Sequence, residues 1–189
     1  IGLLILWPML THCLSIQPVS DTLWMKNIDL TDPNLAEKTQ TQLQPYSSPK
    51  LIIDLRNNHG GYIHSAIAFG ALFVTANPLI QLTDIHDTPL NITRTKTHPL
   101  IQSQLLIILI NKKTASAAEA TAAILKKHPQ AITLGQSSYG KTHISSQKKP
   151  SPYTRILLKN GHIKPDISIP NNATIMQILR HVHSANKNT

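Results

Sequence analysis

Apolar positions along the chain follow two patterns that alternate. Short runs rich in β-branched residues predict strands, and runs with apolar residues at helical spacing predict amphipathic helices. The predicted strands are, in chain order, 23–28, 50–56, 79–85, 91–95, 104–110, 131–134, 143–146 and 153–158. The predicted helices cover 33–44, 62–74, 117–128 and 174–183. Because strands and helices take turns, the sequence predicts an α/β fold with a mainly parallel sheet flanked by helices.

Two of these strands are apolar along most of their length. They read KLIIDLR (50–56) and QLLIILI (104–110). Such runs are typical of parallel strands that are covered on both faces. We also expect Asp32 to cap the first helix, because Pro33 follows it at the position where a helix tolerates proline.

The first 16 residues are apolar, but Pro8 and His12 interrupt them. A membrane-spanning helix needs about 20 apolar residues, so this segment is too short to predict one. It resembles the apolar part of an export signal without the basic residues that normally precede it. Two interpretations stay open, a signal or anchor and a buried strand of a truncated chain. We expect residues 1–20 to be this leading segment and residues 21–189 to form one domain.

Composition excludes several classes of protein. A chain of 189 residues with 41% hydrophobic residues can bury a core, which excludes a disordered chain and a polytopic membrane protein. Cys13 is the single cysteine, so an internal disulfide and a cysteine zinc site are excluded. The net charge of +9 permits nucleic-acid binding, but the basic residues are scattered and aromatic residues make up only 4%. We therefore expect a solvated basic surface and no nucleic-acid partner.

The first segment with candidate chemistry is DLRNNHGG (54–61), directly after a predicted buried strand. Two consecutive glycines permit backbone conformations that a Cβ forbids, and they leave N–H groups free to face a ligand. From this segment alone, a tight turn with no ligand is the favoured explanation of the two glycines.

The second segment places Ser116 at the start of a predicted helix, after the strand 104–110. There the partial positive charge of the helix N-terminus and the N–H of Ala117 can stabilise a negatively charged oxygen on a substrate. The alternative is purely structural, since Ser116 and Glu119 match the capping-box pattern SxxE.

The third segment, GQSSYGKT (135–142), matches the phosphate-binding pattern GxxxxGK[ST]. A phosphate loop of that kind must open a helix, and here the next residues are β-favouring and then interrupted by Pro150 and Pro152. Nucleotide binding is therefore a remote alternative, with Asp54 as its candidate for holding magnesium.

Taken together, these segments and NGHIKPDISIP (160–170) resemble the successive signatures of the C-terminal processing, or tail-specific, serine proteases. The patterns of that family run LDLRNNPGG, VNxxSASASE, GxxTFGKG and GxGIxPDVxV, in the same order. The resemblance covers about residues 23–170 and implies a ClpP/crotonase-like protease core. It also implies a cell-envelope, periplasmic or secreted location, with membrane association through residues 1–16 if they form an anchor.

The resemblance also implies roles for individual residues. Ser116 falls on the nucleophile and Lys141 on the general base of a Ser–Lys dyad, 141 − 116 = 25 positions apart. The N–H groups of Ala117 and Gly61 fall on the oxyanion hole. The implied reaction is peptide-bond hydrolysis through an acyl-enzyme, without metal or organic cofactor. The implied substrates are proteins with accessible, apolar C-terminal tails.

A lysine acts as a base only when it is neutral, and burial away from carboxylates favours the neutral form. No Asp or Glu lies between Glu119 and Asp166 in the sequence, so no local acid holds Lys141 protonated. We therefore expect the Lys141 side chain to be buried and without a carboxylate partner.

The sequence departs from the family pattern around the dyad. The family often has a glutamine four residues after the lysine to orient it, and here that position is Ser145. His59 replaces the proline of NPGG, and Thr142 replaces the glycine after the lysine. No PDZ domain is visible. These changes keep a second function open, a catalytically degenerate relative that binds peptides or apolar ligands.

Overall fold

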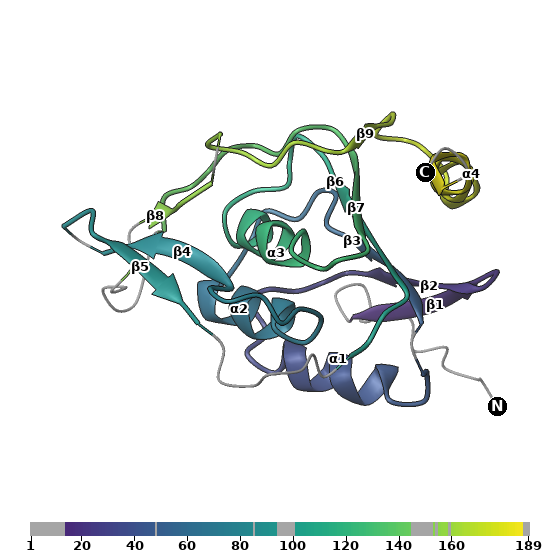
Figure 1. The fold of residues 1–189 in the computed structure, drawn as a ribbon, viewed down its shortest axis with the longest axis horizontal. Coiled ribbons are helices and arrows are strands. Elements are labelled where there is room, and N and C mark those ends of the chain that lie inside the picture. The colour runs from purple at the N-terminus through teal and green to yellow at the C-terminus, as the bar shows by residue number, and fades with distance from the viewer. Residues whose placement is uncertain are drawn as a thin grey trace, which may run out of the picture.

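The computed structural model describes residues 14–47, 49–84, 86–93, 101–144, 153, 155–158 and 160–186. Their helices and strands alternate along most of the chain (Figure 1). In chain order they are β1 (Ser15–Val19), β2 (Thr22–Lys26), α1 (Leu35–Leu43), β3 (Lys50–Asp54), α2 (Ile63–Gly70), β4 (Ile80–Thr83), β5 (Pro89–Ile92), β6 (Leu105–Ile110), α3 (Ala117–Leu125), β7 (Ala131–Gly135), β8 (Arg155–Ile156), β9 (Ile167–Ser168) and α4 (Ile175–Asn186).

The main sheet has six strands in the order β1-β2-β3-β6-β7-β9. Every neighbouring pair is parallel except β1 with β2, which form a hairpin in which Val19 lies opposite Thr22. This arrangement confirms the predicted α/β fold with a mainly parallel sheet. β1 extends that sheet upstream of residue 21, where we expected the domain to begin.

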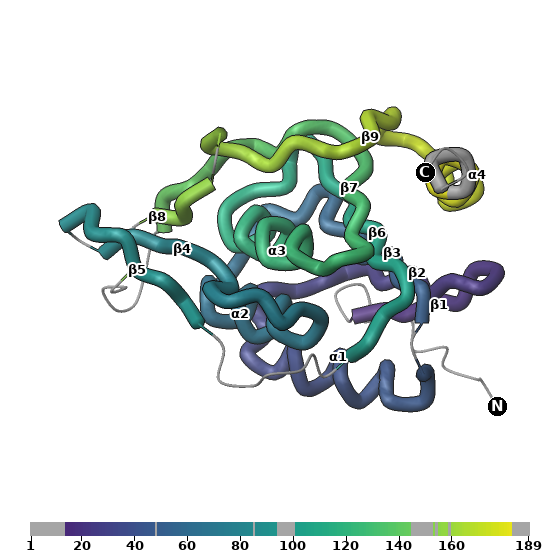
Figure 2. The backbone as a smooth tube through the Cα atoms, viewed as in Figure 1, coloured from purple at the N-terminus to yellow at the C-terminus, as the bar shows by residue number. Residues whose placement is uncertain are grey.

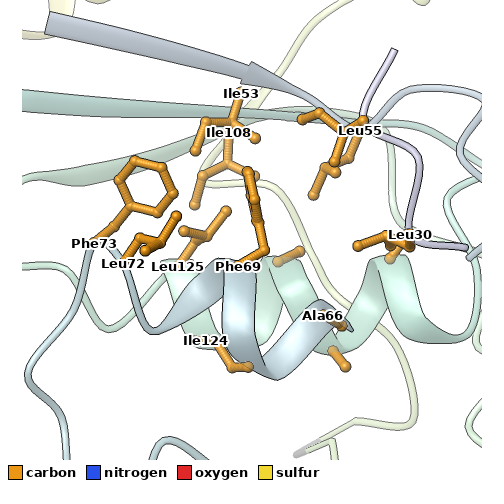
Figure 3. Packing of buried hydrophobic residues seen from close by; sticks show 14 of the residues in the cluster. Leu30, Ile53, Leu55, Ala66, Phe69, Leu72, Phe73, Ile108, Ile124 and Leu125 are labelled. Carbon is orange, nitrogen blue, oxygen red and sulfur yellow. The ribbon is translucent and has the colours of Figure 1, made fainter. Parts of the chain in front are cut away.

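Helices cover both faces of this sheet. Successive residues of a strand point to opposite faces, so Ile53 and Ile108 pack in the cluster under α2 and α3, while Ile52 and Ile107 pack in the cluster under α4. Figure 3 shows the side chains of Phe69 and Leu125 next to those of Ile53 and Ile108. Burial on both faces explains why β3 and β6 are apolar at consecutive positions.

α2 and α3 cross at a very short distance. A Cβ on Gly70, the last residue of α2, would lie 2.6 Å from Cγ2 of Ile124 on α3. Only glycine permits this approach without movement of one helix. The crossing holds α3, whose first residue follows Ser116, against the neighbouring helix.

A second, smaller sheet lies away from the main one, with β4 between β5 and β8 and all pairs antiparallel. At the left of Figure 1 it forms an arm beside α2 and α3. Ile156 of β8 is buried and pairs with Leu82 of β4. Ile156 also lines one cavity with Ala117, the first residue of α3, so β8 lies near the start of that helix.

Several predicted boundaries differ from the structure. α1 begins at Leu35 with Asn34 at its N-cap, although the Asp32 carboxylate still accepts the N–H of Asn34 at 2.9 Å. The Asp32–Pro33 pair therefore forms a turn before the helix. β9 was not predicted, because it has only two residues. Of the predicted strand 143–146, His143 makes a single bridge to Arg155, and residues 145–146 lie outside the described part.

Within the described residues, no helix has the length and apolar character needed to cross a membrane. The predicted signal or anchor falls largely on residues 1–13, which lie outside the described part of the chain.

Candidate active site

Three of the sequence motifs meet because β3, β6 and β7 are adjacent and parallel. The carboxyl ends of parallel strands lie at one edge of a sheet, so the loops that follow them converge there. The N–H of Ala115 donates to the carbonyl of Asn58 at 3.0 Å, which joins the loops after β6 and β3. The N–H of Tyr139 donates to the carbonyl of Thr114 at 2.9 Å, which joins the loops after β7 and β6.

The loop after β3 is folded around Asn58. Its side-chain oxygen accepts the N–H of Gly60 at 3.0 Å, and its side-chain nitrogen donates to the carbonyl of Ile28 at 2.7 Å. Gly60 has φ +97°, and a Cβ there would lie 2.7 Å from the carbonyl oxygen of Ala115. Gly60 is therefore required by a tight approach to the loop that carries Ser116, whereas a Cβ on Gly61 would lie 2.5 Å from the carbonyl oxygen of Leu30.

The loop after β6 is held by Thr114, which is fully buried. Its hydroxyl donates to the carbonyl of Leu55 at 2.8 Å and accepts the N–H of Asn111 at 3.0 Å. This threonine replaces the first serine of the SASAS pattern and supplies the same hydroxyl. Thr114 thus fixes the loop between the end of β6 and Ser116.

Ser116 lies at the N-cap of α3 with φ +57° and ψ −124°. A non-glycine residue in this region carries about 1–3 kcal/mol of strain, and such strain is found at functional sites, including serine nucleophiles on strand-to-helix turns. The Glu119 carboxylate accepts the N–H of Ser116 at 2.9 Å, which is the glutamate half of the predicted capping box. The cap and a chemical role for Ser116 are therefore compatible.

All four residues that the resemblance assigns to the dyad and the oxyanion hole line one cavity of about 160 Å³. Ser116 and Ala117 come from the start of α3, Gly61 from the loop after β3, and Lys141 from the loop after β7. The remaining lining residues are His59, Ile63, Ile144 and Ile156. Ser145, the candidate for orienting the lysine, lies outside the described residues.

Two backbone N–H groups at this cavity are free within the described part of the chain. Neither Gly61 nor Ala117 donates its N–H to another described residue, whereas Gly60 donates to Asn58. Both free groups belong to residues that line the cavity. Two N–H groups of this kind are what an oxyanion hole needs.

Lys141 differs from the sequence-based expectation in one respect. Its side chain is exposed, so the expected burial is wrong. Its nearest sequence neighbours contribute little cover, because Thr142 and Ile144 are only half-buried and His143 is exposed. Within the described residues, Lys141 forms no ion pair with a carboxylate.

The structure disagrees with a phosphate loop at 135–142. The described residues that follow β7, 136–144, contain no helix, so no helix N-terminus faces the loop. Asp54 is also occupied, because its carboxylate accepts two hydrogen bonds from the Arg56 guanidinium, at 2.9 and 2.7 Å, one from the Arg56 backbone N–H at 3.1 Å, and one from Trp24 at 3.3 Å. In return, this carboxylate raises the pKa of Arg56.

Sequence reasoning missed two residues that shape the site. Asn58 organises the glycine loop, and an asparagine two residues before a glycine is a signal for such a turn. Ser138 is buried, donates to Glu119 and accepts the N–H of Ile163 at 2.7 Å. Figure 2 shows the green segment after β7 beside the yellow-green segment before β9, where this contact is made. No local pattern marks Ser138, because its partners are distant in sequence.

Comparison with known proteins identifies the same family as the sequence motifs do. The family model of peptidase family S41 matches residues 23–167. A tail-specific protease of Haemophilus influenzae is 30% identical over 112 residues, which cover 59% of this chain and 16% of the relative. A carboxyl-terminal-processing protease of Picosynechococcus is 28% identical over 144 residues, 70% of this chain and 34% of the relative. The chain thus matches only a minor part of each of these relatives.

Solved structures share the fold at low sequence identity. A lipoprotein from Streptococcus agalactiae has a TM-score of 0.68 and 20% identity, covering 93% of this chain and 70% of that one. The photosystem II D1 C-terminal processing protease has a TM-score of 0.66 and 19% identity, covering 86% and 48%. The four ordered motifs, the α/β core and the match over residues 23–167 show that the chain belongs to peptidase family S41.

Proposed function

We propose that this chain is the catalytic domain of a serine endopeptidase that cleaves proteins with accessible, apolar C-terminal tails. The observation that supports it most directly is the single cavity lined by Ser116, Lys141, Gly61 and Ala117. Three separate loops supply these residues, and each loop matches a motif of the family. The catalytic domain is proposed to begin near β1 and to extend through α4.

In the proposed reaction, Lys141 Nζ takes the proton of the Ser116 hydroxyl as Oγ attacks the carbonyl carbon of the scissile peptide. The carbonyl oxygen becomes an oxyanion, which the N–H groups of Gly61 and Ala117 and the N-terminus of α3 stabilise. The intermediate collapses when the C–N bond breaks and the leaving amine takes the proton from Nζ. Lys141 then takes a proton from a water molecule, whose oxygen attacks the acyl carbon. The ester C–O bond breaks, Ser116 Oγ takes the proton back from Nζ, and the new carboxylic acid leaves.

The exposed Lys141 implies that substrate completes the site. A lysine amine in water is held protonated, and removal of water favours its neutral form. A peptide lying across the cavity would cover Lys141.

A second function is supported by the same exposure. A lysine that stays in water is a poor base at neutral pH, and the glutamine that often orients it is replaced by Ser145. A relative that binds apolar peptides without cleaving them would use the same cavity. The two functions share a ligand and differ only in chemistry.

An assay with an unstructured protein that ends in an apolar tail separates the two functions. We expect Ser116→Ala and Lys141→Ala to abolish cleavage, and the surface variants Ser47→Ala and Lys112→Ala to leave it unchanged. Both control positions are exposed and lie outside the cavity. Equal residual cleavage in the wild type and all four variants would contradict the peptidase function and favour binding without cleavage.

The location and membrane association follow the same proposal. We propose that the protein works in the cell envelope and that residues 1–16 direct it there. Fractionation of cells that express the chain with and without residues 1–16 tests this. An unchanged distribution of the shortened chain would contradict it.

A further inference from the structure

Glu119 is a buried acid that the proposed reaction does not use. It lies in the first turn of α3 with no exposed surface. Its oxygen Oε2 accepts the N–H of Ser116 at 2.9 Å. Its oxygen Oε1 accepts the hydroxyl of Ser138 at 2.5 Å and the N–H of Gly140 at 2.7 Å.

A helix cap accounts for only one of these three contacts. The capping box requires the bond from Ser116, which belongs to the same turn as Glu119. The other two donors belong to the loop after β7, 19 and 21 positions away in sequence. The carboxylate, which has no exposed surface, therefore joins two separate loops.

The two joined loops are those that carry the proposed dyad. One oxygen holds the backbone of Ser116 itself, and the other holds Gly140, the residue before Lys141. We propose that Glu119 is a positioning residue, which sets the distance and direction between the Ser116 hydroxyl and the Lys141 amine. This inference rests on the proposed peptidase function.

Only a carboxylate satisfies this arrangement. Donors lie on both sides of the group, so both oxygens must accept, and an ionised carboxylate has acceptors only. A glutamine has the same shape but presents an NH2 group on one side. Whichever way it turns, that NH2 group faces the N–H of Ser116 or the N–H of Gly140, and one loop is pushed away from the other.

Within the described residues, no cation is paired with Glu119, so its burial depends on these donors and on the N-terminus of α3. The positioning role accounts for an acid that is fully buried at this place.

The test compares Glu119→Gln and Glu119→Asp with the wild type and with Glu37→Gln, the matched change at an exposed glutamate on α1. For a cleavable apolar-tailed substrate, we expect both Glu119 variants to lower kcat about a hundredfold, the cost of a small misplacement of reacting groups. KM should stay within about twofold, because the cavity walls are unchanged. The rate at which a fluorophosphonate labels Ser116 should fall with kcat.

Three outcomes would overturn the positioning role. The first is wild-type kcat in a folded Glu119→Gln. The second is a loss of kcat in Glu119→Gln that Glu119→Asp restores, because then the charge matters and the bridge between the loops does not. The third is an equal loss of kcat in Glu37→Gln, because then the loss of any glutamate has the same effect.

If Glu119→Gln does not fold, Ser138→Ala tests the proposal, since it removes one contact and leaves the carboxylate in place. We expect the kcat of Ser138→Ala to fall several-fold, and an unchanged kcat would overturn the proposal.

Hydrogen exchange separates this inference from the peptidase function. We expect the amides of Ser116 and Gly140 to exchange at least tenfold faster in Glu119→Gln than in the wild type or Glu37→Gln. If these amides are unchanged, the bridge is refuted even when the wild type cleaves its substrate. If the wild type cleaves no better than Ser116→Ala, the peptidase function fails, and the positioning role fails with it even if the exchange result holds.

Discussion

Gly60 lies so close to Ala115 that no side chain fits between them. A Cβ on Gly60 would stand 2.7 Å from the carbonyl oxygen of Ala115 and 2.9 Å from the N–H nitrogen of Ala117. The second of these atoms is a proposed oxyanion donor. The contact therefore joins the glycine loop to the start of α3. It thereby fixes the two segments that carry the proposed oxyanion donors, Gly61 and Ala117, relative to each other.

Replacement of Gly60 by alanine should disrupt the site more than it disrupts the fold. The φ of +97° and the clash with Ala115 together should lower the free energy of unfolding by about 1–3 kcal/mol. Labelling of Ser116 by a fluorophosphonate should be lost, because the loop must move away from Ala117. Urea denaturation and the labelling rate measure the two effects.

Gly161→Ala is the matched control for that change. Gly161 also has a positive φ, +70°, but a Cβ there would meet no atom within 4 Å. We expect it to lose about 1 kcal/mol of stability from backbone strain alone and to keep normal labelling of Ser116. Loss of labelling in both variants would contradict a role for the Gly60–Ala115 contact.

The helix crossing at Gly70 predicts a compensating pair of substitutions. Gly70→Ala places a methyl group against Ile124 and should lower the free energy of unfolding by about 1–3 kcal/mol. Ile124→Ala should also destabilise, because it leaves a cavity. Since the second change makes room for the first, the double variant should lose less free energy of unfolding than the two single variants lose in total. A double-mutant cycle in urea measures this, and additivity would contradict the close crossing.

Thr114 predicts a difference between two conservative substitutions. Thr114→Val keeps the shape but leaves the N–H of Asn111 without its partner, and should cost about 1–3 kcal/mol of unfolding free energy. The carbonyl of Leu55 loses one of two donors and still accepts the N–H of Asn58. Thr114→Ser keeps the hydroxyl and restores the residue of the family pattern. The free energy of unfolding of Thr114→Ser should therefore stay much closer to that of the wild type. Thermal unfolding of the two variants measures this, and equal melting temperatures would contradict it.

His128 predicts a loss of stability at mildly acidic pH. Burial lowers the pKa of its imidazole below the ordinary value of 6.5. Its Nδ1 accepts the N–H of Gln130 at 3.1 Å, and its Nε2 lies 3.2 Å from the Ser103 hydroxyl. The unfolded chain therefore binds a proton at a higher pH than the folded chain does. This contribution to stability is complete above about pH 6.5 and is lost as the pH falls toward the folded pKa.

Urea denaturation between pH 5 and pH 8 measures this effect. We expect His128→Gln to reduce the loss of stability between pH 6.5 and pH 5, and His181→Gln, at an exposed position on α4, to leave it unchanged. An identical pH dependence in His128→Gln and the wild type would contradict the prediction.

Part of the molecule could be predicted from local pattern alone. β3 and β6 were predicted because burial on both faces leaves an unbroken apolar run. α3 was predicted because Pro129 ends its run and because the basic residues 126–128 suit the last turn of a helix. Boundaries were less certain. α1 begins at Leu35, since the Asp32 side chain satisfies a turn before the helix. β9 has two residues and takes its form from pairing with β7.

The sequence by itself determined the alternation of strands and helices, the family resemblance and the identity of Ser116, Lys141, Gly61 and Ala117 as candidates, because these depend on residues that are close along the chain. Only the tertiary structure brought those four residues to one cavity, exposed Lys141, and joined Glu119 to Ser138 and Gly140. The reason is physical. Adjacent parallel strands bring their carboxyl ends together at one edge of the sheet, and contacts across that edge join residues whose separation in sequence carries no local signal.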